Sequence, residues 1–183
     1  MKFSWQKLKK PFFVLAPMEG GTDTVFRQIV ISCGKPDAVF TEFTNVEGLL
    51  SKGKERVGKR LFFSKNEHPI IAQIWGITPN AFYEVAKQVS SMRFDGIDIN
   101  MGCPEKTVVK HGACSALIEN PSLAKEIIQA TKEGLKCHSE QSEESIPVSV
   151  KTRIGFKTIQ TEVWISFLLK QDIDALSVHF RTQ

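Results

Sequence analysis

The sequence predicts an α/β fold, a partial TIM (β/α)8 barrel in which about six of the eight βα units are present. Strand-like apolar runs alternate with segments of helical periodicity, which is typical of βαβ units and a parallel sheet. No GxGxxG motif follows a predicted strand, which argues against a dinucleotide-binding sheet. A full barrel takes about 250 residues, or about 200 at the low end. The chain has 183 and stops just after the sixth predicted strand.

The first half of the chain contains three predicted strands, at residues 12–18, 38–43 and 69–76. Thr22 or Asp23 can cap the helix that follows the first strand, and Gly34 can end it. A basic stretch punctuated by glycine covers residues 51–60. Thr78 and Pro79 form a typical helix start after the third strand.

The second half supplies the other three predicted strands, at residues 96–100, 147–154 and 175–182. Asn120 and Pro121 open a helix with an apolar side, and another helix surrounds residues 164–169. Residues 137–145 are polar and have no period, so they are interpreted as a solvated surface insertion.

The net charge, the cysteines and the lengths of the apolar runs limit the classes of protein to which the chain can belong. The net charge of +4 favours anionic partners without identifying one. The four cysteines form no CxxC pair, so the sequence predicts free thiols in a reducing compartment and no metal site. The apolar run at residues 12–16 is too short for a signal peptide, and no run approaches the roughly 18 residues of a membrane span. These features predict a cytoplasmic protein without membrane contact.

Polar residues collect at the carboxyl ends of the predicted strands, where barrel enzymes place their chemistry. In the fifth strand Ser149, Lys151 and Arg153 alternate with apolar neighbours and should face the barrel axis. A Lys side chain is costly to bury without a partner. Either an anionic or electron-rich ligand meets Lys151, or Asp98 or Glu42 neutralises it in an internal ion pair.

Cys103 lies in a Gly-Cys-Pro loop directly after the fourth strand. A lone Cys is usually a small buried hydrophobe. At a strand end, however, the thiol can lean over the barrel mouth as a nucleophile or as a proton donor. No His is adjacent in sequence to activate it, so a neutral thiol acting as an acid is at least as plausible.

Several segments together resemble the tRNA-dihydrouridine synthases, flavin-dependent TIM-barrel enzymes that reduce specific uridines in tRNA. They occur in the family's order from about residue 11 to the end, and DINMGCP is the most specific of them. The segments are APMEGGTD (16–23) with Phe26-Arg27, TEF (41–43), AQIWG (72–76), DGIDINMGCP (95–104), GACSAL (112–117), SVKTRIG (149–155) and SVHFRT (177–182).

The resemblance implies a cofactor, a reductant and a proton donor. FMN would be bound by Pro17, Met18, Gln73, Asn100, Lys151 and His179. NADPH would reduce the flavin, flavin N5 would pass hydride to uracil C6, and Cys103 would protonate C5. Arg153 and Arg181 would meet the uracil or a nearby phosphate. The basic stretch could add contacts to tRNA, or it could be a solvated surface.

Three residues depart from the family pattern. Phe180 and Cys114 stand where the family usually has Gly, and Glu19 is unusual beside a flavin. We expect Phe180 to crowd the mouth next to His179 and Cys114 to stiffen the catalytic loop. None of the three removes a proposed catalytic group.

The resemblance makes residues 1–183 the N-terminal part of a flavin-binding catalytic domain. The last two βα units and the family's helical tRNA-binding domain are absent, which argues against activity of this stretch alone. Two alternatives stay open: a flavin barrel that acts on a free pyrimidine, as dihydroorotate dehydrogenases do, and a non-catalytic RNA-binding remnant. The oligomeric state does not follow from the sequence.

Overall fold

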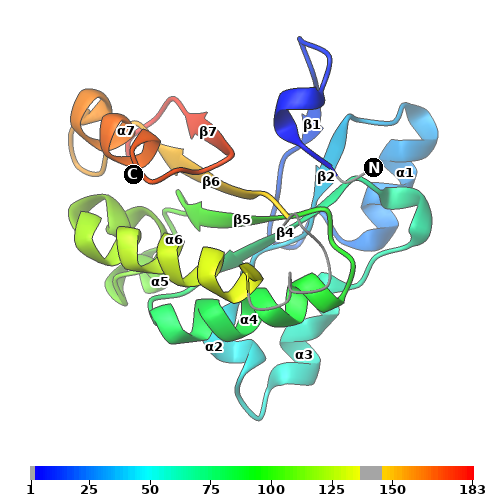
Figure 1. Cartoon of the computed structure of the whole chain (residues 1–183), viewed down its shortest axis with the longest axis horizontal. Coiled ribbons are helices and arrows are strands. Elements are labelled where there is room, and N and C mark those ends of the chain that lie inside the picture. Colours follow the sequence, from blue (N-terminus) through cyan, green and yellow to red (C-terminus); the bar gives the residue numbers. More distant parts are fainter. Residues whose placement is uncertain (1–2, 137–145) are drawn as a thin grey trace.

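The computed structural model describes residues 3–136 and 146–183, so the predicted insertion at residues 137–145 lies outside the described residues. A curled parallel sheet runs in the order β1-β2-β4-β5-β6-β7, with the short β3 paired to β4 beside that path (Figure 1). This confirms the predicted partial barrel. The strands are β1 Val14–Leu15, β2 Ala38–Phe40, β3 Thr44–Asn45, β4 Ile70–Trp75, β5 Gly96–Met101, β6 Val148–Arg153 and β7 Ala175–His179.

Helices connect the strands as the alternating pattern predicts. They are α1 Thr24–Cys33, α2 Val46–Leu49, α3 Lys54–Gly58, α4 Pro79–Ser91, α5 Lys106–Lys110, α6 Pro121–Lys136 and α7 Thr161–Leu169. Short 3-10 turns are η1 Trp5–Lys7, η2 Lys59–Leu61, η3 Lys65–Glu67 and η4 Cys114–Glu119. None of the helices in the described ranges is long and apolar enough to cross a membrane.

The predicted helix starts and stops have visible causes. The Asp23 side chain accepts the N–H of Phe26 at 2.8 Å and caps α1, while Gly34 ends that helix. Helix α4 begins at Pro79, as predicted. At the start of α6 the Asn120 side chain accepts the N–H of Leu123.

Three strands are shorter than the sequence suggests. Strand β1 pairs only with β2, and Pro17 cannot donate a main-chain hydrogen bond to extend it. After β2 the chain turns toward β3, which pairs with β4 in its own short ladder. Strand β7 ends at His179 because Arg181 N–H folds back onto the His179 carbonyl at 2.8 Å.

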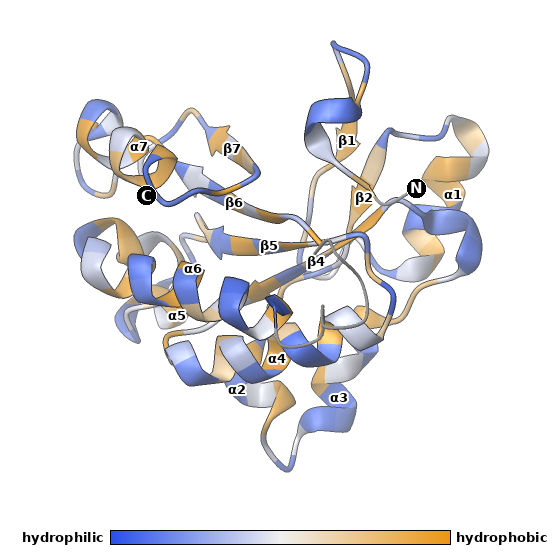
Figure 2. Cartoon of the chain, in the orientation of Figure 1, coloured by the Kyte–Doolittle hydropathy of each residue, from blue (hydrophilic) through white to orange (hydrophobic). Residues whose placement is uncertain are grey.

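The sheet has two chemically different faces because its strands alternate. Figure 2 shows hydrophilic and hydrophobic residues interleaved along β5 and β6. The apolar set of β6, Val148 and Val150, belongs to the main core, as predicted. Helices α4 and α6 pack against each other and cover this face of the sheet (Figure 1). They approach closely at Gly134, where a Cβ would lie 2.3 Å from the Tyr83 carbonyl oxygen.

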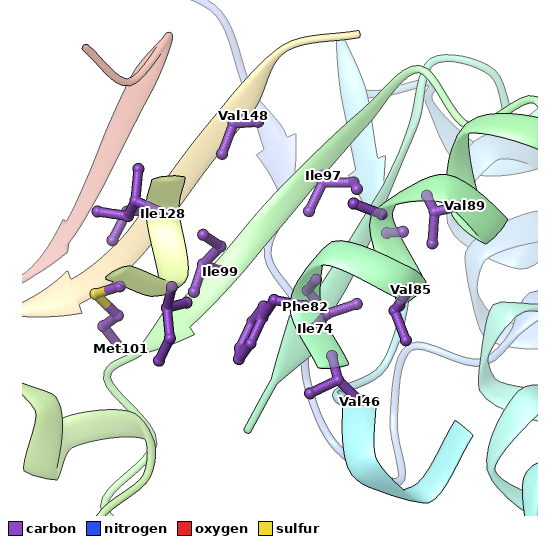
Figure 3. Packing of buried hydrophobic residues seen from close by; sticks show 14 of the residues in the cluster. Val46, Ile74, Phe82, Val85, Val89, Ile97, Ile99, Met101, Ile128 and Val148 are labelled. Atoms are coloured by element: carbon purple, nitrogen blue, oxygen red, sulfur yellow. The ribbon is translucent and has the colours of Figure 1, made fainter. Parts of the chain in front are cut away.

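The core joins α4 to the central strands. Figure 3 shows Phe82 of α4 beside Ile74 of β4, and Val85 of the same helix and Ile97 of β5 belong to the same cluster. Each of these four side chains is fully buried, which stabilises the fold by about 1.5–3 kcal/mol per side chain. The apolar face therefore anchors the central strands and leaves their polar face for chemistry.

Candidate active site

Strand register places polar side chains from three strands in one row. Gln73 of β4 is opposite Asp98 of β5, and Asp98 is opposite Ser149 of β6. Asp98 accepts hydrogen bonds from Gln73 Nε2 at 2.7 Å and from Ser149 Oγ at 2.6 Å. All three side chains are buried. Burial raises the pKa of Asp98 to about 6, although both hydrogen bonds and the charge of Lys151 oppose that rise.

The next row lies two residues closer to the carboxyl ends of the strands. There Asn100 is opposite Lys151, and Lys151 is opposite Ser177. Lys151 is half-buried, and within residues 3–136 and 146–183 it makes no hydrogen bond or ion pair. Burial lowers its pKa, with Asp98 acting in the opposite direction. Among the described residues Lys151 has no direct ion pair, while the charge of Asp98 stabilises the Lys151 ammonium from a distance.

Asn100 organises the loop that follows β5. Its Oδ1 accepts the main-chain N–H groups of Gly102 and Cys103, each at 3.0 Å, and its Nδ2 donates to Gln73 Oε1 at 3.0 Å. Arg153 holds the same loop from β6, because its Nε donates to the Gly102 carbonyl at 2.6 Å. The loop is thus fixed on both sides by side chains of the strand ends.

Cys103 is half-buried on this loop, and its nearest titratable neighbour is a second thiol. A hydrogen bond from Cys114 lowers the pKa of Cys103 to about 6, with burial opposing that shift. The main-chain N–H of Glu105 and the charge of Arg153 act in the same direction as Cys114. The pKa of Cys114 itself is raised because it shares this hydrogen bond and is buried. Negative charge on the pair therefore resides on Cys103.

A cavity of about 320 Å³ adjoins Cys103. Aromatic, aliphatic and charged side chains line it: Glu19, Phe43, Asn45, Arg56, Val57, Arg60, Trp75, Cys103, Glu105, Val108 and Cys114. Glu19 is paired here with Arg60, whose Nε donates to Glu19 Oε1 at 3.0 Å. The Glu19 carboxylate, which is unusual beside a flavin, is thus neutralised by Arg60 of the basic stretch.

The remaining predicted residues lie at the two ends of the sheet. His179 is exposed and is opposite Arg153 in the register of β7; slight desolvation and the charges of Arg153, Lys151 and Arg181 lower the pKa of His179. Pro17 and Met18 follow β1; Pro17 is buried and Met18 is 44% exposed. Among the described residues, no hydrogen bond joins Pro17 or Met18 to the group around Lys151. Phe180 is 82% exposed, beyond the end of β7.

Sequence reasoning missed part of the site. Trp75 and Phe43 were read only as ends of strands or as motif letters, yet both line the cavity beside Cys103. Their positions at or just beyond strand ends were the available signal. Arg60 was assigned to a general basic stretch, and its pairing with Glu19 across 41 positions has no local signal. No group of three potential metal ligands occurs in the ranges that the structure describes.

This arrangement can hold a planar, acceptor-rich ring and transfer a proton. The Lys151 ammonium is available to acceptor atoms on the polar face of the sheet, and the buried Gln73 and Asn100 amides beneath it each use one N–H within the site. Cys103 stands at the edge of that group with an acidic thiol. Such a set suits chemistry on a heterocycle rather than hydrolysis.

Comparisons with known proteins agree with this geometry. Residues 14–183 match the family model described as Dihydrouridine synthase (Dus). The chain is 48% identical to a probable tRNA-dihydrouridine synthase of Staphylococcus aureus (strain Mu50) and 46% identical to probable tRNA-dihydrouridine synthase 2 of Bacillus subtilis (strain 168). Each match covers 98% of this chain but 52% and 53% of those proteins, so the chain spans about half the length of these curated relatives. On this evidence, the chain belongs to the dihydrouridine synthase family.

Proposed function

We propose that this chain carries the ring-binding and proton-donating part of a site that reduces uridine to 5,6-dihydrouridine in tRNA, with FMN as cofactor and NADPH as reductant. The observation that carries the proposal is the placement of Cys103 near a half-buried Lys151 that makes no hydrogen bond or direct ion pair among the described residues. The family match supports the reaction class. The names of the relatives support tRNA as the substrate.

The residues present fit a flavin. An isoalloxazine ring has a polar pyrimidine edge, and the Lys151 ammonium would meet it with an unused positive charge. The Gln73 amide donates one N–H to Asp98, and the Asn100 amide donates one N–H to Gln73. Each amide has a second N–H that would donate to the same edge of the ring. Pro17 and Met18 would give the ring an apolar surface, and His179 would lie beside it.

Reduction of the uracil C5=C6 bond takes one hydride, which FMN supplies at C6 when bound, and one proton, which Cys103 Sγ gives up at C5. Cys103 must therefore be protonated to act. The Cys103 N–H donates to Asn100 Oδ1 and Arg153 Nε donates to the Gly102 carbonyl, and these two hydrogen bonds keep the thiol in place during that transfer. A pKa of about 6 makes the Cys103 thiol a better proton donor than an ordinary cysteine, and the fraction that is protonated falls as pH rises through that value.

Arg153 and Arg181 would bind the uracil or an adjacent phosphate. Arg153 donates from Nε and Nη1 to two carbonyls, which leaves further guanidinium N–H bonds for a ligand. Arg56 and Arg60 reach the cavity of Cys103 from the basic stretch, so the stretch is joined to the site. These cations would contact tRNA phosphates, and binding would weaken as salt rises.

The first experiment is the visible absorption spectrum of the purified chain before and after adding FMN. We expect a bound-flavin spectrum that is lost in Lys151→Ala and Gln73→Ala. Uridine reduction in tRNA is then assayed with Cys103→Ala. A flavoprotein that turns over free orotate would instead indicate a free-pyrimidine enzyme. Salt-sensitive tRNA binding with no flavin would indicate an RNA-binding remnant and would overturn the proposal.

A further inference from the structure

Cys114 is a buried thiol that the proposed reduction does not use. It is 1% exposed and begins η4, the turn that follows α5. Its φ of 53° lies in the left-handed region, which glycine adopts freely and a side chain adopts at a cost of about 1–2 kcal/mol. The Cys114 thiol in this conformation lies near enough to Cys103 to act on its pKa.

Several contacts bring the two cysteines together. The thiols of Cys103 and Cys114 lie close enough for each to shift the pKa of the other. The N–H of Ser115 donates to the Cys103 carbonyl at 3.3 Å, which ties the two backbones. Both cysteines line the same cavity. The two segments are therefore joined by a main-chain hydrogen bond, and their sulfurs lie near each other.

We propose that Cys103 and Cys114 form an oxidation site for hydroperoxides, in which Cys103 is oxidised first and Cys114 resolves it to an intramolecular disulfide. The cavity gives a small peroxide access to Cys103, which is half-buried, whereas Cys114 is shielded from solvent. Exposure alone would favour Cys33 at the end of α1, but Cys33 makes no contact with another thiol among the described residues.

The chemistry balances with a hydroperoxide as the only oxidant. The Cys103 thiolate attacks the peroxide, the O–O bond breaks, and Cys103 becomes a sulfenic acid while one oxygen leaves as hydroxide or alkoxide. The sulfur of Cys114, on losing its proton, then attacks the Cys103 sulfur, and water leaves as the S–S bond forms. The two sulfurs are oxidised by two electrons in total, and the peroxide is reduced by two. A dithiol reductant reverses the change.

Local electrostatics favours the first step. Because the thiolate is the attacking form, the lowered pKa of Cys103 increases the reactive fraction at neutral pH. The Cys114 thiol that stabilises this charge is also the group placed to trap the sulfenic acid. The disulfide would remove the proton donor of the proposed reduction, and only this consequence rests on the proposed function.

Peptide mapping tests the site without flavin or tRNA. Trypsin cleaves after Lys106 and Lys110, so Cys103 and Cys114 fall in separate peptides, residues 94–106 and 111–125. After brief treatment with hydrogen peroxide and alkylation of the denatured protein, we expect these two peptides to be joined by a bond that dithiothreitol breaks. We expect Cys33 to stay largely alkylatable under the same conditions.

Two variants assign the roles. Cys114→Gly suits the left-handed backbone, and we expect it to lose the cross-link and to accumulate a dimedone adduct on Cys103. Cys103→Ser should leave Cys114 reduced, because the peroxide does not reach the shielded thiol. Cys114→Ser replaces Cys114→Gly if circular dichroism shows that the latter is unfolded. Wild-type protein whose Cys103 is oxidised to sulfinic acid while Cys114 remains alkylatable, or whose two thiols both survive peroxide, overturns the proposal.

Discussion

The Cys103 main chain is joined to the Asn100 side chain by a hydrogen bond of 3.0 Å, from the Cys103 N–H to Asn100 Oδ1. Asn100 is the fifth residue of β5, so the strand itself positions the loop that follows it. The same Oδ1 also accepts the N–H of Gly102. Asn100 therefore holds the proposed proton donor, in addition to the role in flavin binding that we propose for its remaining N–H.

Replacing Asn100 with Ala should loosen this loop. The main-chain N–H groups of Gly102 and Cys103 lose their acceptor, and Gln73 Oε1 loses its donor. We expect a loss of about 1–3 kcal/mol in the free energy of unfolding, measured by urea denaturation. Asn80→Ala on the exposed side of α4 is the control and should change stability little. Equal stability of the two variants would contradict the assignment.

Removing the second thiol should raise the pKa of Cys103. In Cys114→Gly the hydrogen bond that lowers this pKa to about 6 is gone, so the value should move toward about 8.5. The rate of Cys103 alkylation by iodoacetamide, followed by peptide mass across pH, measures the shift. In wild type, a reaction that needs protonated Cys103 should decline as pH rises through about 6. In the variant that decline should occur at higher pH; an unchanged midpoint would show that Cys114 is not the cause.

The polar rows of the site could be predicted in part from strand alternation. Alternation places Lys151 and Arg153 on the polar face, and the structure agrees. The pairing of Gln73 with Asp98 and Ser149 depends on the register between strands, which is set by main-chain ladders between segments 25 to 51 positions apart. A single sequence contains no local signal for that register, so the network around Asp98 could not be derived.

The contact between Cys103 and Cys114 illustrates the same limit at shorter range. The sequence singled out both residues, one for its loop and one for its departure from the family pattern. Their contact depends on the left-handed backbone at Cys114 and on the path of α5 between them. Glycine is the residue that adopts a left-handed backbone most readily, so sequence patterns do not predict a thiol held in that conformation.

Asp98 should make stability depend on pH. Its folded pKa of about 6 is above the ordinary value of 3.8, so the folded state binds more protons between these values and the stability that this group contributes is lost as pH rises through about 6. Asp98→Asn removes the buried charge while keeping groups that can pair with Gln73 and Ser149. We expect the variant to gain on the order of 2 kcal/mol at pH 8 relative to wild type, and less at pH 4. Urea denaturation at the two pH values measures this, and a gain that is equal at both would refute the pKa shift.

The buried pair of Arg27 and Glu67 should matter more for folding than surface ion pairs do. Both side chains are fully buried, and Glu67 also accepts hydrogen bonds from Thr24 and from the Ser64 N–H. Glu67→Gln leaves the Arg27 charge without its counterion, and we expect a loss of about 3–5 kcal/mol. Glu84→Gln, which breaks the exposed pair with Lys87, should cost less than about 1 kcal/mol. Thermal denaturation of both variants makes the comparison, which fails if the two losses are similar.

Lys151 should strengthen ligand binding without stabilising the fold. Burial disfavours its charge, and the charge of Asp98 offsets this only in part, so Lys151→Met should leave the free energy of unfolding unchanged or raise it. The same change removes the charge proposed to meet the polar edge of FMN, and we expect at least about tenfold weaker binding, measured by quenching of flavin fluorescence. Lys157→Met, on the exposed loop after β6, is the matched control and should leave binding unchanged. A stabilised Lys151→Met that binds FMN as wild type does would show that the unpaired ammonium serves some ligand other than the flavin. Loss of both stability and binding would mean that Lys151 is structural. Lys151 is identified as a ligand-binding residue only if Lys151→Met weakens FMN binding while the free energy of unfolding stays unchanged or rises.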